Sequence, residues 1–335
     1  MNICIVGAGA IGCLLGARLA ACTPHAPGVV ARGDTLQALR RHGWRADTAQ
    51  AMLQAPARVV EQASQLGPQD LVILAVKGPA LREAVRDIAP LLAPHTMVLP
   101  AMNGVPWWFC AAQPGLDAAP LRSVDPGGDI AAAIPLHHVL GCVLHVTASR
   151  PEPGMALQRG PAKLIVGEPA GGQSERAERA CEVLRQAGLD VTHSGNVRSD
   201  VWYKLWGNLT TNPVSALTGA TIDQILADPL VRRLCTDAMH EARTLGERLG
   251  CPVEQTPEQR HRITASLGAF RTSMLQDALA SRPLELDAIV GAVHELGLRM
   301  AVPTPCIDAL FGLTRLMARV RGLYPWPAAN PEPSA

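Results

Sequence analysis

The feature that most constrains the fold is a glycine run close to the N-terminus. The β-branched, apolar stretch 2–6 leads directly into Gly7-Ala8-Gly9-Ala10-Ile11-Gly12, and the Leu- and Ala-rich stretch 13–21 follows. This order predicts a strand, a tight turn and a helix. A G-x-G-x-x-G run between a strand and a helix is the fingerprint of a dinucleotide-binding fold.

All six residues of the glycine run are predicted to contact a cofactor. Gly7 would permit the tight turn, Gly9 would let the backbone approach a pyrophosphate, and Gly12 would let the helix pack closely on the strand. The N–H groups and the positive dipole at the start of that helix favour a bound phosphate. A glycine-rich turn that packs a helix without a ligand remains the alternative interpretation at this point.

Short apolar strands alternate with helical stretches in the first half of the chain. Such alternation is typical of a parallel sheet, so we expect an α/β fold with a Rossmann-type doubly wound sheet. The strands expected after the first are 29–31, a run near 57–61, 71–76 and 97–100. Two later strands, 141–148 and 163–167, are expected to form a hairpin that extends this sheet.

Helical periodicity dominates from Val197 onward, and no further convincing strand is present. A length of 335 residues suits two domains. We therefore predict a Rossmann-type, cofactor-binding domain over 1–196 and an all-α domain over 197–322 that carries substrate-binding and catalytic residues. The proline-rich stretch 323–335 has little to bury and is expected to be a disordered tail.

Composition narrows the partners and the compartment. Lys and Arg number 30 and Asp and Glu 29, so no uniform field attracts polyanions, and we expect no nucleic-acid partner. The N-terminal residues lack the basic flank and cleavage site of a signal peptide. Apolar segments such as 71–76 are far shorter than the roughly 20 residues that span a bilayer. The nine cysteines are scattered and odd in number. We expect a soluble, cytoplasmic protein with free thiols, no metal site and no membrane partner.

Arg32 stands where the cofactor preference of such a fold is decided. An acidic side chain at the end of the second strand holds the ribose hydroxyl of NAD, whereas an arginine accepts the 2′-phosphate of NADP. The strand 29–31 ends in Arg32. Asp34 is the rival ligand, but it is more simply interpreted as the N-cap of the helical stretch 36–40. NADP is favoured, and NAD or mixed use stays open.

Two polar residues follow predicted parallel strands at their carboxyl ends, the edge at which open α/β sheets bind ligands. Lys77 comes directly after the strand 71–76, and Asn103 follows the strand 97–100 in an Asn-Gly pair. A solvated lysine that closes a strand and an ordinary Asn-Gly turn are the alternatives.

In the second domain, Lys204, Asn208 and Asn212 recur at i, i+4 and i+8 and form one polar stripe on a helix. Its apolar neighbours indicate a largely buried helix, and buried polar groups need partners, of which a ligand is one. Burial lowers the pKa of a lysine and suits it to proton donation. A lysine paired with a structural carboxylate is the alternative. The apolar neighbours are Trp202, Leu205, Trp206 and Leu209.

Glu285 follows Pro283, which is expected to start a new helix, so Glu285 would lie in the first turn of that helix. A glutamate there commonly caps the helix or complements its dipole. Ser273 opens the preceding stretch Ser273-Met274-Leu275-Gln276-Asp277.

Taken together, the glycine run, Lys77, Asn103-Gly104, the stripe of Lys204, Asn208 and Asn212, and the Ser273 stretch with Glu285 resemble the ketopantoate reductase (2-dehydropantoate 2-reductase) family. The resemblance covers most of residues 1–320. It implies an active site between a Rossmann-type and a helical domain, and a possible homodimer. It also implies that NADPH reduces a 2-oxo acid, foremost 2-dehydropantoate, to (R)-pantoate in pantothenate biosynthesis.

The resemblance also implies residue roles. Lys204 would be the general acid that protonates the developing alkoxide, and Glu285 would hold the substrate hydroxyl and help to position Lys204. Asn208, Asn212 and Ser273 would hold the substrate, and Lys77 and Asn103 would line the cofactor and the reaction centre. The chemistry is consistent, because a nearby ammonium stabilises the negative charge that hydride arrival places on oxygen.

One position departs from the family pattern. Phe270 stands where members similar to ketopantoate reductase carry an asparagine, so a polar substrate contact is absent. This favours an apolar substrate, because pockets discriminate strongly through paired polar groups. Two further interpretations therefore stay open: a mandelate dehydrogenase-like enzyme for a bulkier, apolar 2-oxo or 2-hydroxy acid, and a non-catalytic NADP-binding regulator. The presence of both Lys204 and Glu285 counts against the regulator.

Overall fold

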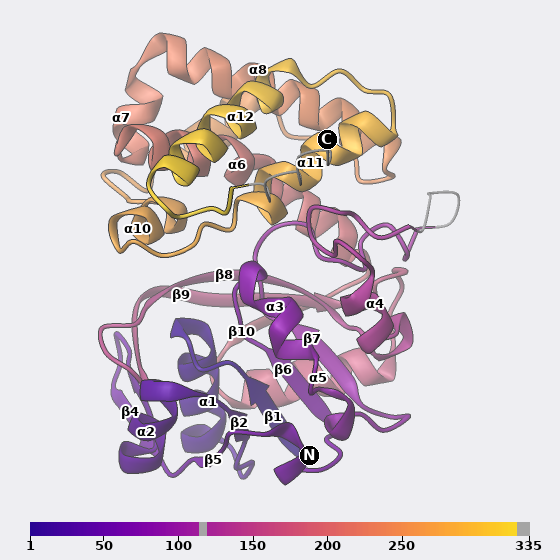
Figure 1. Ribbon diagram of the computed structural model, residues 1–335, viewed down its shortest axis with the longest axis vertical. Helices are drawn as coiled ribbons and strands as arrows, with labels where there is room; N and C mark the ends of the chain where they lie inside the picture. Colours follow the sequence, from indigo (N-terminus) through magenta and orange to yellow (C-terminus); the bar gives the residue numbers. More distant parts are fainter. Residues whose placement is uncertain (114–118, 327–335) are drawn as a thin grey trace, which may run out of the picture. The chain divides into compact units, whose positions relative to one another are not determined.

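The computed structural model describes residues 1–113 and 119–326. The chain divides into two compact units, Met1–Lys204 and Leu205–Ala335 (Figure 1). The expected boundary at 196/197 coincides with the start of helix α6 (Val197–Thr218), but the first unit continues to Lys204. The reason is local packing. The Arg198 guanidinium donates to the Phe109 carbonyl at 3.0 Å, which ties the first turn of α6 to the N-terminal unit.

Five parallel strands form the first sheet of the N-terminal unit, in the order β5-β2-β1-β6-β7. The chain builds outward from β1 in both directions, so the strand order reverses between β1 and β6. Ligands bind at such a switch point, beyond the carboxyl ends of the strands. The parallel sheet expected from the sequence is confirmed. The strands are β1 (Ile3–Val6), β2 (Gly28–Val30), β5 (Arg58–Val60), β6 (Leu71–Leu74) and β7 (Met97–Pro100).

A second sheet has the order β10-β9-β3-β4, and β8 pairs with β9. The predicted hairpin exists as the antiparallel pair β8/β9, but the expectation that it extends the first sheet is wrong. Its strand β9 instead takes β3 and β10 as parallel neighbours. The sequence interpretation missed three of these strands, β3, β4 and β10. The bounds are β3 (Trp44–Asp47), β4 (Met52–Ala55), β8 (Gly141–Ser149), β9 (Met155–Gly167) and β10 (Asp190–Ser194).

Helix α1 (Ala10–Cys22) contacts both sheets, since it packs against β1 as well as against β3, β4, β8 and β9. Small residues make this possible. A Cβ on Gly16 would lie 2.3 Å from the Trp44 ring, and a Cβ on Gly12 would lie 2.0 Å from the Gly7 carbonyl oxygen. The predicted role of Gly12 in close packing of helix on strand agrees with this geometry.

The other helices of the N-terminal unit are short and connect strands along the chain. They are α2 (Gly33–His42), α3 (Gly78–Val85), α4 (Asp129–Ala133) and α5 (Glu175–Gln186), with the 3-10 turns Ala63–Gln65, Ala89–Leu91 and Leu136–His138. The nine cysteines, all within the described residues, are free thiols, and seven of them are buried.

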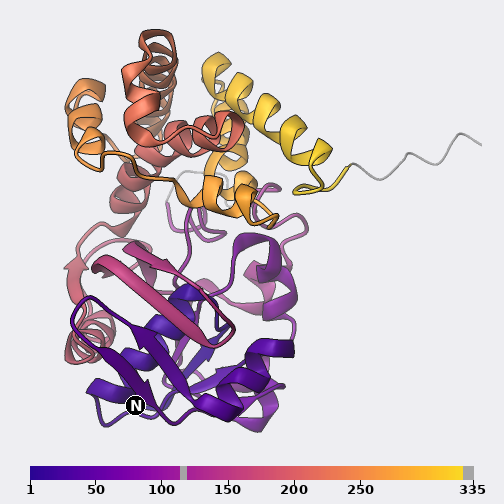
Figure 2. The ribbon, with the colours of Figure 1, turned by 90° about the vertical axis from the view of Figure 1, so that its left-hand side faces the viewer.

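The C-terminal unit is helical, as predicted, and its described residues, 205–326, include no strand (Figures 1 and 2). Proline stands at the start of α8, α9 and α12, where its missing N–H costs no helical hydrogen bond. After α6, the helices are α7 (Ile222–Ala227), α8 (Pro229–Arg248), α9 (Pro257–Ala265), α10 (Ser273–Leu279), the π-helical segment η4 (Asp287–Gly291), α11 (Ala292–Arg299) and α12 (Pro305–Val320).

The prediction of a disordered tail over 323–335 places the first residue of that tail too early in the chain. Residues 327–335 lie outside the described residues, but Leu323 is only 6% exposed and its carbonyl accepts a hydrogen bond from the Leu284 amide. The Tyr324 hydroxyl donates to the Asp287 carboxylate at 2.6 Å. These contacts hold the chain beyond the end of α12. Among the residues described, no helix has the length and apolar character needed to cross a membrane.

The close packing of α1 predicts opposite effects for one substitution at two helical glycines. Gly16→Ala places a methyl group in the Trp44 ring and should destabilise the protein by about 1–3 kcal/mol. Gly312→Ala in α12 meets no atom within 4 Å and should stabilise it by up to about 1 kcal/mol. Urea unfolding of both variants measures the difference. Equal effects would contradict the packing account.

Candidate active site

A cavity of about 280 Å³ in the N-terminal unit lies at the carboxyl ends of β1 and β2. Gly7, Ala8 and Gly9 line it, together with Arg32 at the end of β2. The cavity therefore occupies the edge at which this sheet order places a ligand. The other predicted cofactor contacts, Ala10, Ile11 and Gly12, form the first turn of α1 and do not line this cavity.

The backbone of the glycine run is shaped for close approach. Gly7 has φ +92°, and a Cβ there would lie 2.4 Å from a Val76 methyl group. The Gly7 amide donates to the Val30 carbonyl at 3.1 Å, which ties the turn to β2. Gly9 is the N-cap of α1 and offers no side chain to cap it. The first-turn amides of α1 therefore have no side-chain cap and can bind an anion, and the adjoining cavity wall of Gly7, Ala8 and Gly9 leaves room for a phosphate to approach the backbone.

Arg32 lines the cavity beside two carboxylates of α3 and the turn that follows it. Its guanidinium lies 2.5 Å from the Glu83 carboxylate and 3.5 Å from that of Asp87. The interpretation of Asp34 as an N-cap is wrong, because α2 already begins at Gly33 and Arg32 takes the N-cap position. Gly33 adopts φ +56°, which lets the helix start earlier than expected. Asp34 lies in the first turn and does not line the cavity.

Lys204 and Asn103 meet at the same edge of the first sheet. Asn103 follows β7, and the turn after it relies on Gly104, which has φ +86°. The Lys204 ammonium donates to the Asn103 side-chain oxygen at 2.6 Å and also to the Leu144 carbonyl. Both of these acceptors are neutral, and the pairing of Lys204 with a structural carboxylate, which the sequence left open, stays untested. The two contacts hold an ammonium beside the carboxyl end of β7.

Lys77 has an exposed side chain and occupies the N-cap position of α3. Its carbonyl accepts a hydrogen bond from the Ala80 amide at 2.9 Å. Its neighbour Val76 lines the cavity, whereas Lys77 is not among the lining residues. A role of Lys77 toward the cofactor stays a prediction.

The polar stripe predicted on α6 continues into the C-terminal unit. Asn208 is half-buried, and Asn212, one turn later, is 5% exposed. Ser273 is exposed as the first residue of α10, whose N-cap Thr272 accepts from the Leu275 amide at 3.2 Å. The substrate-binding roles of Asn208, Asn212 and Ser273 stay predictions.

Glu285 is buried, at 8% exposure, but it does not lie in the first turn of a helix as predicted. Helical residues begin only at Leu286, so Pro283 does not start the helix. In the segment before it, Arg282 pairs with Asp277 at 3.0 Å and the Leu284 amide donates to the Leu323 carbonyl. Glu285 lies two residues before the π-helical segment η4, a feature frequent at functional sites.

Sequence reasoning missed several residues that line the cavity. Glu83 and Asp87 come from α3 and its following turn, and Thr35 comes from α2. Arg150 follows β8 in the second sheet. No local pattern marks these residues, because only the packing of the second sheet and of α3 brings them to the glycine run.

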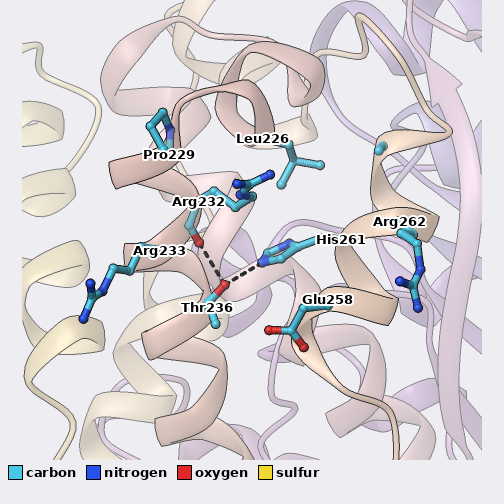
Figure 3. Close-up of a pocket in the computed structure, with 9 residues that line it drawn as sticks. Leu226, Pro229, Arg232, Arg233, Thr236, Glu258, His261 and Arg262 are labelled. Atoms are coloured by element: carbon cyan, nitrogen blue, oxygen red, sulfur yellow. Dashed lines mark hydrogen bonds between the residues drawn. The ribbon is translucent and has the colours of Figure 1, made fainter.

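A larger cavity, of about 640 Å³, lies within the C-terminal unit among α7, α8 and α9 (Figure 3). None of the predicted site residues lines it. The His261 ring contacts the Thr236 hydroxyl at 3.0 Å, and that hydroxyl in turn donates to the Arg232 carbonyl (Figure 3). Burial lowers the pKa of His261. This cavity is larger than the one at the glycine run, but size alone does not make it the active site, because none of the predicted catalytic or cofactor-binding residues lines it.

The cavity at the glycine run, the parallel sheet and the ammonium at its carboxyl edge define a dinucleotide-dependent oxidoreductase. The family model described as "Ketopantoate reductase PanE/ApbA" matches residues 3–171, and "Ketopantoate reductase PanE/ApbA C terminal" matches residues 196–318. The chain belongs to the ketopantoate reductase family.

Individual relatives agree with this assignment. A 2-dehydropantoate 2-reductase of Mesorhizobium japonicum is 42% identical over 325 residues, which cover 97% of this chain and 100% of the relative. A crystal structure of a Ralstonia solanacearum protein, provisionally assigned as a ketopantoate reductase, is 52% identical with a TM-score of 0.92 and covers 96% of this chain and 99% of its own. A D-mandelate dehydrogenase structure shares the fold at 21% identity, with a TM-score of 0.82 and coverage of 96% and 100%.

The buried His261 predicts a pH dependence of stability. Because its pKa in the folded protein lies below the ordinary 6.5, the unfolded chain binds more protons as the pH falls through that value. The free energy of unfolding should therefore decrease below pH 6.5, and His261→Gln should reduce this decrease. Urea unfolding on either side of that pH measures it. His42 is exposed, so His42→Gln serves as the control. If both variants reduce the decrease equally, His261 is not its source.

Proposed function

We propose that the protein reduces 2-dehydropantoate to (R)-pantoate with NADPH, a step of pantothenate biosynthesis. The contact between Lys204 and Asn103, 2.6 Å long, carries this proposal, because it fixes a proton donor at the ligand-binding edge of the sheet. The full-length similarity to a 2-dehydropantoate 2-reductase supports the choice of substrate.

The chain's own residues then divide the work. NADPH, when bound along Gly7, Ala8 and Gly9, supplies the hydride. The Lys204 ammonium stabilises the negative charge that develops on the carbonyl oxygen of the substrate and donates a proton to that oxygen. Asn103 orients the ammonium through its side-chain oxygen. Glu285, Asn208, Asn212 and Ser273 are proposed to hold the substrate, with Glu285 also positioning Lys204.

The preference for NADPH over NADH is proposed from Arg32. Its side chain lines the cavity directly after β2, where an acidic residue would select NAD. The expected homodimer also stays a proposal, and analytical ultracentrifugation of the purified chain tests it.

Phe270 supports a second candidate function, the reduction of a bulkier, apolar 2-oxo acid. Its half-buried side chain replaces a family asparagine, while its carbonyl accepts from the Ile222 amide at 3.0 Å. A phenyl ring offers no hydrogen bond to the substrate hydroxyl of 2-dehydropantoate, and it adds apolar surface. A mandelate dehydrogenase-like activity would use the same Lys204 chemistry, and it remains the second candidate.

Lys204→Ala should lower kcat with NADPH and 2-dehydropantoate by about 10²–10⁴-fold, because it removes the general acid. The Kd for NADPH should change little. Lys163→Ala, a lysine of β9, serves as the matched control and should retain activity. Following NADPH oxidation in all three proteins measures the effect. Full activity of Lys204→Ala would contradict the mechanism, and a wild type that binds NADPH but reduces no 2-oxo acid would favour the regulator.

Phe270→Asn should raise kcat/KM for 2-dehydropantoate roughly tenfold and lower it for an apolar 2-oxo acid such as phenylglyoxylate, since it restores a polar contact. Comparing both substrates in the wild type and the variant measures the change in preference. If the ratio of the two kcat/KM values does not move, Phe270 does not face the substrate.

A further inference from the structure

Arg150 is the second arginine of the cofactor cavity, and it comes from the second sheet. It directly follows β8, and it lines the cavity together with Arg32. It donates to the Thr35 hydroxyl at 3.2 Å, and Thr35 lies in the first turn of α2. Arg32 is the N-cap of the same helix. Two guanidinium groups therefore flank one helix N-terminus.

The charges around the two arginines differ. The carboxylates of Glu83 and Asp87 already compensate the charge of Arg32, and Glu61 adds a further negative charge to the cavity wall. The charge of Arg32 is therefore already shared with two carboxylates before a phosphate binds. Within the described part of the chain, Arg150 pairs with no carboxylate, and its contact to Thr35 is neutral. Its charge remains available to an anionic ligand.

The start of α2 adds neutral donors between the two arginines. No side chain caps this ten-residue helix, so its first-turn amides can donate to an anion. The Thr35 oxygen accepts from Arg150, which leaves the Thr35 hydroxyl hydrogen to donate to the same anion.

The turn that carries Arg150 is fixed in place rather than free. Arg45 of β3 pairs with Glu152 at 2.7 Å and donates to the Pro153 carbonyl at 3.2 Å. Gly154, with φ +72°, lies so close to α2 that a Cβ would come within 3.1 Å of Ala38. This anchoring holds the turn against α2 and keeps Arg150 beside Thr35.

We infer that Arg150 binds the 2′-phosphate of NADPH together with Arg32, Thr35 and the N-terminal amides of α2. The inference rests on the proposed use of NADPH and assigns the discrimination against NADH to a residue of the second sheet. A guanidinium binds phosphate oxygens in a planar, bidentate manner. Arg150 is a specificity-determining residue with no part in hydride or proton transfer.

The test compares ligands that differ only in the phosphate. Calorimetric titration of the full chain with 2′,5′-ADP, 5′-AMP, NADPH and NADH gives the affinities. Arg150→Ala should weaken the binding of 2′,5′-ADP and of NADPH by roughly ten- to a hundredfold, because it removes a charge-assisted hydrogen bond to the phosphate. The same variant should change the affinities for 5′-AMP and NADH by less than about twofold. Arg159→Ala serves as the matched control, because Arg159 of the same hairpin pairs with Asp47 and does not line the cavity.

Each outcome separates this inference from the proposed function. If Arg150→Ala leaves 2′,5′-ADP unchanged while Arg32→Ala weakens it, the inference fails and NADPH use stands. Equal weakening of 2′,5′-ADP and 5′-AMP would assign Arg150 a structural role and overturn the inference. Equal binding of 2′,5′-ADP and 5′-AMP by the wild type would overturn the NADPH preference itself. Arg150→Lys should restore part of the affinity for 2′,5′-ADP.

Discussion

The rest of the structure depends on the close packing of helix α1 against the glycine turn and the two sheets. Side chains are excluded at Gly7, Gly12 and Gly16, where a Cβ would meet Val76, the Gly7 carbonyl and the Trp44 ring. Because Gly12 and Gly16 carry no side chain, α1 can pack against both sheets. Gly12 and Gly16 thus support the core, and Gly7 lines the cofactor cavity.

Features that repeat along the chain were predictable from the sequence. The glycine run and the buried strands predicted the parallel sheet, and helical periodicity predicted the C-terminal unit. Features that depend on packing between distant segments were not predictable. The assignment of β8/β9 to a second sheet follows from pairing with β3 and β10, and the order of residues 323–326 follows from contacts with segments far upstream in the chain.

The candidate site shows the same division. The sequence singled out Lys204 and Asn103 separately, but only the fold brings these residues, distant in the chain, to a hydrogen bond of 2.6 Å. Arg150 carried no local signal, since its place beside Thr35 depends on the anchored turn after β8. Buried Glu285 was expected on a helix and instead precedes one, in a segment whose contacts to Asp277 and Leu323 no local sequence pattern marks.

The central claim is that this fold uses its dinucleotide cavity and Lys204 to reduce a 2-oxo acid. The most direct measurement follows NADPH consumption and product formation together, with 2-dehydropantoate as the substrate and the full chain as the enzyme. The account predicts one pantoate formed for each NADPH consumed. Tight NADPH binding without any hydroxy acid formed, from 2-dehydropantoate or from an apolar 2-oxo acid, would contradict it.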